Sequence, residues 1–193
     1  TNDNARKEAI YKKTVELYPN DFRAYNNLGM MAYANGDLAT AENYFKQAAS
    51  KSSSAAEVNT NLGLCELVKG NVAEAENYLS KSTGANTANE ALGNLYIKQG
   101  QYDKAVAAFG DTKTNSAALA QILAKDYNKA KNTLTAVKNP DAYTDYLMAI
   151  VGARTNNADL VKSSMDKVKQ QDAALAAKAQ NDREFAKYAN EVK

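Results

Sequence analysis

Few side chains in this sequence have the types and spacing that catalysis requires. The 193 residues include no His and one Cys, Cys65, so the commonest metal ligand and the usual general acid or base near neutral pH are absent. A lone Cys cannot form an internal disulfide, and in a helix it is typically a small buried hydrophobe. The acidic residues Glu74 and Glu76, like Asp166 and Asp172, have the spacing of exposed helix charges. We therefore predict no catalytic, cofactor or metal site, and no enzymatic activity.

The charge balance argues against several classes of partner. The net charge is +2, with Lys and Arg scattered among Asp and Glu, so no large single-sign field would attract nucleic acid or an anionic membrane surface. The lysines of residues 162–178 alternate with Asp and apolar residues, as on a solvated helix face. No apolar run reaches the roughly 18 residues that a bilayer span needs. We predict neither nucleic-acid binding nor direct membrane insertion.

Composition and an internal repeat predict the elements that position the remaining residues. Two Pro, nine Gly and no Trp, in a chain that is 45% hydrophobic, favour an all-α fold. The stretch NLGMMAYANGDLATAENYF at residues 27–45 recurs as NLGLCELVKGNVAEAENYL at residues 61–79, an offset of 34 residues. A period of this length is typical of a helix-turn-helix unit whose apolar face is covered by its neighbours. Gly36 is expected to end the first helix of its unit in a left-handed conformation, and Asp37 to cap the second.

Those repeated positions resemble the tetratricopeptide repeat family, whose pattern is an aromatic residue, Leu-Gly and Tyr in the first helix, then Gly, an aromatic residue, Ala, Phe, Ala and Pro. The first full unit matches at Tyr25, Leu28, Gly29, Gly36, Leu38, Ala41, Phe45 and Ala48. The unit ALGNLYIKQGQYDKAVAAF matches at Leu92, Gly93, Tyr96, Gly100, Tyr102, Ala105 and Phe109. The resemblance implies a right-handed α-solenoid of antiparallel helix pairs, with about 12–13 helices and degenerate later repeats.

The same register predicts a single solenoid domain over residues 1–193. Its parts are a half repeat at 5–20, full repeats at 22–55, 56–85 and 86–114, degenerate repeats at 115–140 and 141–170, and capping helices at 171–193. The half repeat is a second helix without its first, and its apolar stripe of Ile10, Tyr11, Val15 and Leu17 lacks a partner on one side. This pattern motivates the hypothesis that the chain is a piece of a longer protein.

By the family resemblance, the first helices line a concave groove that holds a peptide or a partner helix. The candidate groove residues are Arg23, Asn26, Asn27, Met30 and Tyr33 from the first unit, Thr60, Asn61 and Leu64 with Glu57 and Leu67 from the second, and Glu90, Asn94 and Ile97 with Thr87 and Ala91 from the third.

Two binding chemistries of the family can be compared with these positions. A clamp for a terminal carboxylate needs Lys or Arg in the third unit, but Thr87 and Ala91 stand there. A ladder of Asn side chains would bind the backbone of an extended peptide, and Asn27 and Asn61 occupy its positions. Ala91 interrupts the ladder, although Asn94 lies one turn away. The alternative is that these Asn are solvated polar residues on a helix face.

The predicted function is therefore a protein–protein interaction scaffold that binds a protein or peptide in the groove. The alternative is a structural spacer, or an accessory domain, of a larger multidomain bacterial envelope protein. The Asn-, Thr- and Lys-rich composition resembles repeat modules attached to bacterial envelope proteins, which favours the periplasm or an outer-membrane association over the cytoplasm. The identity of the partner and the oligomeric state are left open by the sequence.

Overall fold

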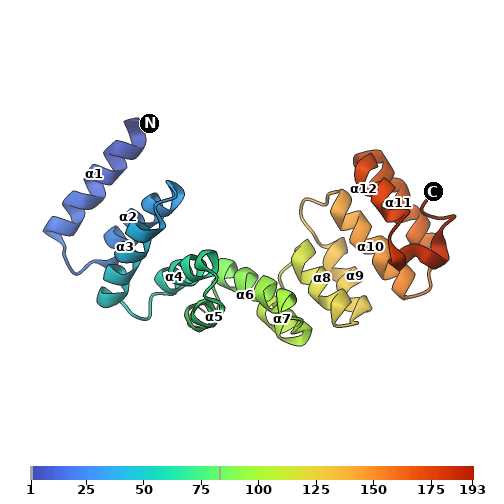
Figure 1. Ribbon diagram of the computed structural model, residues 1–193, viewed down its shortest axis with the longest axis horizontal. Coiled ribbons are helices and arrows are strands. Elements are labelled where there is room, and N and C mark those ends of the chain that lie inside the picture. The colour runs from blue at the N-terminus through green and yellow to red at the C-terminus, as the bar shows by residue number, and fades with distance from the viewer. Residues whose placement is uncertain (1, 83) are drawn as a thin grey trace. The chain divides into compact units, whose positions relative to one another are not determined.

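The computed structural model describes residues 2–82 and 84–193, and every regular element in those ranges is a helix (Figure 1). Helices account for 76% of the structure, which confirms the predicted all-α class. The elements are α1 (Asn2–Leu17), α2 (Phe22–Ala34), α3 (Leu38–Lys51), α4 (Ala56–Lys69), α5 (Val72–Ser80), α6 (Asn86–Lys98), α7 (Tyr102–Phe109), α8 (Asn115–Leu123), α9 (Tyr127–Thr135), α10 (Ala142–Arg154), α11 (Ala158–Gln171), α12 (Ala173–Ala179) and the 3₁₀ helix η1 (Arg183–Tyr188). They form two compact units, residues 1–92 and 93–193, whose boundary lies within α6.

Helix pairs recur in both units because the same turn is built five times. The first helix of each pair is followed by a residue with positive φ: Gly36, Gly70, Gly100, Lys125 and Asn156, with φ between 55° and 81°. After each of them the next backbone N–H bonds back to the helix, as Asp37 N does to Ala32 O at 2.9 Å. This is the hydrogen bond of a Schellman-type helix end, which satisfies carbonyls that the helix leaves unpaired. The fourth and fifth pairs therefore keep the turn although they lack its glycine.

Within a pair, the two helices cross at a small residue. A Cβ atom placed on Gly29 of α2 would lie 2.5 Å from Cε1 of Phe45 in α3, a ring that is 1% exposed. Gly63 and Gly93 stand in the same relation to Leu79 and Phe109. In the α8–α9 and α10–α11 pairs the equivalent residues are the fully buried Ala118 and Ala149. Each lies in the buried cluster that contains the large residue of its partner helix, Leu134 or Met165 respectively.

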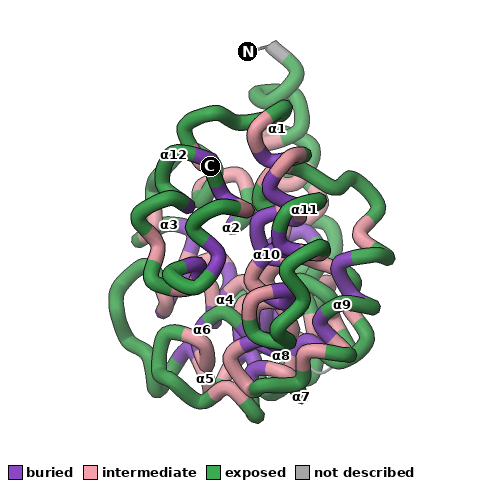
Figure 2. Tube along the Cα trace, turned by 90° about the vertical axis from the view of Figure 1, so that its right-hand side faces the viewer, coloured by how far each residue is buried: buried purple, intermediate pink, exposed green. Residues whose placement is uncertain are grey.

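The terminal helices differ in how far they are buried. In α1, Val15 packs against the core of the α2–α3 pair, but Ile10 and Leu17 are 56% and 61% exposed. In the second unit, Phe185 and Tyr188 of η1 are buried with residues of α10 and α11. Figure 2 shows the contrast between the mostly exposed α1 and the buried stretch of α10.

An ion-pair network ties α3 to α4 in the first unit. The Lys69 Nζ donates to Glu66 at 2.8 Å and to Glu42 of α3 at 3.1 Å, and Lys46 pairs with Glu42 at 2.6 Å. The Glu66 side chain is only 7% exposed and also accepts from Asn71 Nδ2 at 2.7 Å. The bond from Lys69 and the one from Asn71 hold the pKa of Glu66 below its usual range, because both favour the charged carboxylate.

We expect Gly29→Ala to lower the free energy of unfolding by about 1–3 kcal/mol, the range for overpacking. In an unconstrained helix the same change would stabilise by about 1 kcal/mol, so the sign of the effect reports the contact with Phe45. Chemical denaturation of Gly29→Ala in the parent and in a Phe45→Leu background measures the coupling. An equal effect of Gly29→Ala in both backgrounds would contradict the packing described above.

Lys125→Gly is expected to raise the free energy of unfolding by roughly 1 kcal/mol, because glycine adopts the left-handed conformation without the steric cost that Lys bears there. The control is Lys131→Gly, an exposed lysine inside α9, which should lower it by about 1 kcal/mol. Thermal unfolding of both variants makes the comparison, and a loss of stability in Lys125→Gly would speak against strain at this turn.

Glu66→Gln should lower the free energy of unfolding by about 1–2 kcal/mol at pH 7 through the loss of a charged hydrogen-bond acceptor. The folded pKa of Glu66 is depressed, so its contribution is present above the unfolded value of about 4.3 and is lost as the pH falls through the folded pKa. Urea titrations from pH 7 to about pH 3 should show parent and variant converging. The exposed control Glu74→Gln should stay within about 0.5 kcal/mol of the parent at pH 7. If Glu66→Gln lowered the free energy of unfolding by the same amount at every pH, the charge of Glu66 would not be the cause.

Candidate binding pocket

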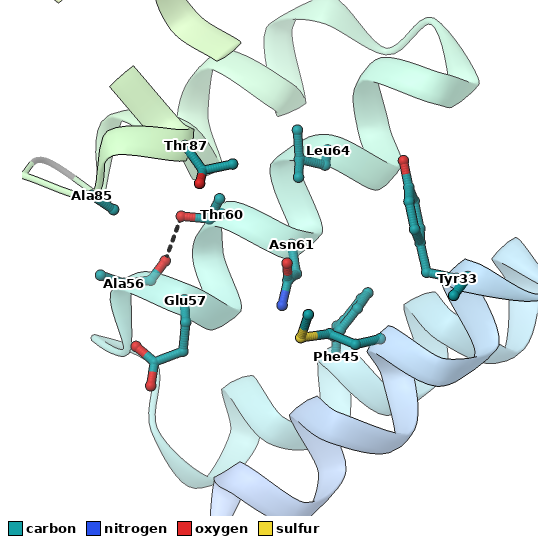
Figure 3. Close-up of a pocket in the computed structure, with 11 residues that line it drawn as sticks. Tyr33, Phe45, Ala56, Glu57, Thr60, Asn61, Leu64, Ala85 and Thr87 are labelled. Atoms are coloured by element: carbon teal, nitrogen blue, oxygen red, sulfur yellow. Dashed lines mark hydrogen bonds between the residues drawn. The ribbon is translucent and has the colours of Figure 1, made fainter. Parts of the chain in front are cut away.

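The first unit contains a cavity of about 560 Å³ between α2, α4 and the start of α6 (Figure 3). Its lining is mostly apolar. The residues that line it are Met30, Tyr33, Ala34, Phe45, Ala56, Glu57, Thr60, Asn61, Leu64, Ala85 and Thr87.

Two helix faces form the main walls. Met30 and Tyr33 lie about one turn apart on α2 and are 51% and 36% exposed. On α4, Thr60, Asn61 and Leu64 follow Glu57 at intervals of three and four residues, so all four occupy one helix face. At the repeat offset of 34 residues, Met30 of α2 and Leu64 of α4 are equivalent positions, whereas the other lining residues of the two helices are not, so α2 and α4 turn different parts of their surfaces toward the cavity.

The floor of the cavity is the ring of Phe45 from α3. This ring is 1% exposed and reaches the cavity because Gly29 has no Cβ to block it. Phe45 also belongs to the buried cluster that includes Leu62 and Cys65 of α4. The contact that joins α2 to α3 therefore also shapes the pocket.

The third wall depends on a loop that returns to α4. The Oγ of Ser82, a fully buried residue, donates to the backbone oxygen of Ala56 at 2.9 Å. Ala85 N donates in turn to Ser82 O at 3.0 Å. These bonds hold the end of the α5–α6 connection against the first turn of α4, which brings Ala85 and Thr87 to the pocket.

Hydrogen bonds within the walls fix the orientation of two polar side chains. Asn61 Nδ2 donates to Oδ1 of Asn26 on α2 at 2.9 Å, and Asn26 is only 6% exposed. Thr60 Oγ1 donates to Ala56 O at 2.7 Å, drawn as a dashed line in Figure 3. The hydroxyl hydrogen of Thr60 is thus used, and the amide nitrogen of Asn61 is turned toward α2.

Seven of the groove residues predicted from the sequence meet in this pocket: Met30, Tyr33, Glu57, Thr60, Asn61, Leu64 and Thr87. Other predicted residues of the first unit lie elsewhere. Arg23 stands at the start of α2, where its guanidinium binds the N-cap Asp21 at 2.6 Å. Asn26 is buried beneath Asn61. Asn27 lines a neighbouring hollow of about 290 Å³ between α1 and α2, which shares Met30 and Ala34 with the pocket.

Of the predicted residues of α6, Thr87 lines the cavity, whereas Glu90, Ala91, Asn94 and Ile97 do not. Asn94 is exposed and Glu90 is half-buried. Ile97 is half-buried and packs against the cluster that contains Phe109 and Ala117. Asn27 and Asn61 also lie in different hollows, so the structure does not bring the two predicted ladder residues into one site.

The sequence reasoning missed Phe45, Ala34, Ala56 and Ala85 as pocket residues. The sequence marks Phe45 as a family position, and only its place across from Gly29 shows that the ring faces the cavity. Ala34 follows Met30 by one turn, so helical periodicity could have found it. Ala85 reaches the pocket through the Ser82 contact, which no local sequence signal announces.

The groups most associated with chemistry are not arranged for it. Cys65 is buried, and burial raises the pKa of its thiol, which disfavours the reactive thiolate. Among the residues described here, no three His, Cys, Asp or Glu side chains are grouped so that they could hold a metal ion. Within the same ranges no helix combines the length and apolar character needed to span a bilayer.

Comparisons with solved structures place the fold. The chain is similar to YrrB, described as a TPR protein with an unusual peptide-binding site, at a TM-score of 0.68 and 20% identity, covering 88% of this chain and 97% of that one. It is also similar to PilF of Pseudomonas aeruginosa, at a TM-score of 0.72 and 14% identity, covering 98% of this chain and 90% of that one. The structure of PilW, a type IV pilus biogenesis factor, is similar at a TM-score of 0.63 and 20% identity, covering 99% of this chain and 91% of that one. At these identities the structural similarity establishes the fold alone, an α-solenoid of helix pairs. A comparison with curated proteins found no match to the sequence.

Three family models match the sequence directly. All are described as tetratricopeptide repeats, and they match residues 10–43, 31–90 and 87–110. The matches overlap and together include both first helices of the pocket. The chain therefore belongs to the tetratricopeptide repeat family.

Proposed function

We propose that this chain is an interaction scaffold that binds an extended segment of a partner protein in the pocket between α2 and α4. Family membership supports a helical-repeat scaffold in general terms. The similar protein YrrB is described as having a peptide-binding site. What carries the proposal for this chain is its own pocket, where exposed apolar side chains surround a hollow.

The exposure of Met30 and Tyr33 is the central observation. Both are large apolar or aromatic residues in a concave lining, and each leaves a third or more of its surface in water. A ligand side chain placed between them would remove that surface from water and gain the hydrophobic free energy of burial. The cavity volume of about 560 Å³ lies within the usual range for ligand pockets.

The experiment is a selection of random peptides on the immobilised full chain, followed by affinity measurements on synthesised peptides that enrich. The test variant is the double substitution Met30→Ser and Tyr33→Ser. The matched control is Val68→Ser with Val72→Ser, two exposed apolar residues near the α4–α5 turn that do not line the pocket.

We expect the pocket variant to weaken binding of the selected peptides about tenfold or more, since it removes two apolar contacts that each contribute on the order of 1 kcal/mol. The control variant should bind within about twofold of the parent, because neither of its residues touches the ligand. Circular dichroism should show both variants folded. Failure to enrich any peptide, or equal binding by both variants, would contradict groove binding and favour a spacer or accessory domain.

A further inference from the structure

We propose that the bound segment combines an apolar side chain with a basic one, a lysine or arginine whose charge is held at Glu57. This inference rests on the proposed function and specifies its ligand. It follows from the charge, the hydrogen-bonding capacity and the layout of the pocket walls.

Glu57 is the one charged residue among those that line the pocket. Its side chain is exposed, and within the described residues no Lys or Arg forms an ion pair with it. Two carboxylates of the same unit do have such partners: Asp21 binds Arg23, and Glu42 binds Lys46 and Lys69. An unpaired carboxylate beside an apolar cavity favours a cationic group on the ligand.

The uncharged polar walls have the same bias toward accepting hydrogen bonds. Thr60 has donated its hydroxyl hydrogen to Ala56, so that its oxygen can only accept from a ligand. Asn61 has turned its amide nitrogen to Asn26, and its Oδ1 has no partner in the part of the chain that the structure describes. Together with the Glu57 carboxylate, these groups suit a ligand rich in N–H donors, as ammonium and guanidinium groups are.

The walls disfavour anionic ligands by the same reasoning. No Lys or Arg lines the pocket, so a terminal carboxylate or a phosphate would find no opposite charge there and would lie near Glu57. Desolvating such a group without a partner is costly. The preference is therefore opposite in sign to that of a carboxylate clamp.

The layout separates the two halves of the ligand. Figure 3 shows Glu57 at one end of the cavity and Tyr33 at the other, with Asn61 and Leu64 between them. Beyond α2 lies the separate hollow lined by Asn27, which borders the pocket at Met30 and Ala34. A segment with room to continue past the pocket is an internal stretch of chain, so we assign the cation to a side chain rather than to a terminal amine.

Glu57 also lies in the first turn of α4, where a carboxylate stabilises the helix through its interaction with the helix dipole, whether or not a ligand binds. Glu74 provides the matched control, because it is an exposed glutamate in the first turn of α5 and does not line the pocket. If helix stabilisation were the whole role, Glu57→Gln and Glu74→Gln would lower the melting temperature alike and neither would alter binding.

The experiment uses peptides from a random selection on the full chain that require Met30 and Tyr33 for binding. Their affinities are measured by fluorescence anisotropy for the parent, Glu57→Gln and Glu74→Gln. Each peptide is also made with its basic residue replaced by Gln. We expect the pocket-dependent peptides to contain Lys or Arg near an aromatic or aliphatic residue. Glu57→Gln should weaken binding about five- to tenfold, Glu74→Gln should not, and the peptide and protein changes should not be additive.

Exchanging the charges of Glu57 and of the peptide's basic residue gives a second test of their pairing. Glu57→Lys should weaken binding of the basic peptide further and recover part of the affinity for the same peptide with Glu in place of Lys or Arg. Raising the salt from about 50 mM to 500 mM should weaken the parent complex more than the Glu57→Gln complex, because salt screens the charge pair.

The outcomes separate the two proposals. Pocket-dependent peptides that are neutral or acidic, with binding unchanged in Glu57→Gln, would overturn the basic-ligand inference and leave groove binding intact. Absence of any peptide that depends on Met30 and Tyr33 would overturn both.

Discussion

The close contact between Gly29 of α2 and the Phe45 ring of α3 is the constraint on which the first unit depends. Because Gly29 has no Cβ, the ring can lie across the helix crossing and be almost fully buried. The ring belongs to the buried core with Leu62 and Cys65 of the next helix, and it also lines the pocket. Helix pairing, stacking and the shape of the candidate site thus all follow from a single small-to-large contact.

Ion pairs and hydrogen bonds of the first unit join neighbouring helix pairs to one another. Ion pairs of Lys69 with Glu42 and Glu66 join α3 to α4 away from the cavity. The Asn61 to Asn26 bond joins α4 to α2 at its wall. Both satisfy groups that burial would otherwise penalise, and the second also leaves an acceptor unpaired at the pocket. The polar character of the site is therefore a consequence of how the helices are held together.

The later pairs show how far the repeat can drift without losing its fold. The turn residue changes from glycine to Lys125 and Asn156, and the small crossing residue changes from glycine to Ala118 and Ala149. The turn hydrogen bond is kept in both pairs, at Asp126 and Asn157. What the fold requires is a left-handed residue and a small one at these positions, and glycine is only the least strained way to supply them.

The residue pattern was enough to predict the helical class and the family, and through the family the helices that line the pocket. The repeat of 34 residues set the register, and the family resemblance then predicted Met30, Tyr33, Glu57, Thr60, Asn61, Leu64 and Thr87 as groove residues. It could not show that Asn26 is buried or that Asn27 faces a separate hollow, since neighbouring helical residues point in different directions and only packing decides which is covered. Only the folded structure shows that Phe45 forms the floor, that Ser82 brings Ala85 to the wall and that no Lys or Arg of the described residues pairs with Glu57. These depend on contacts between helices and loops, where short-range patterns carry no information.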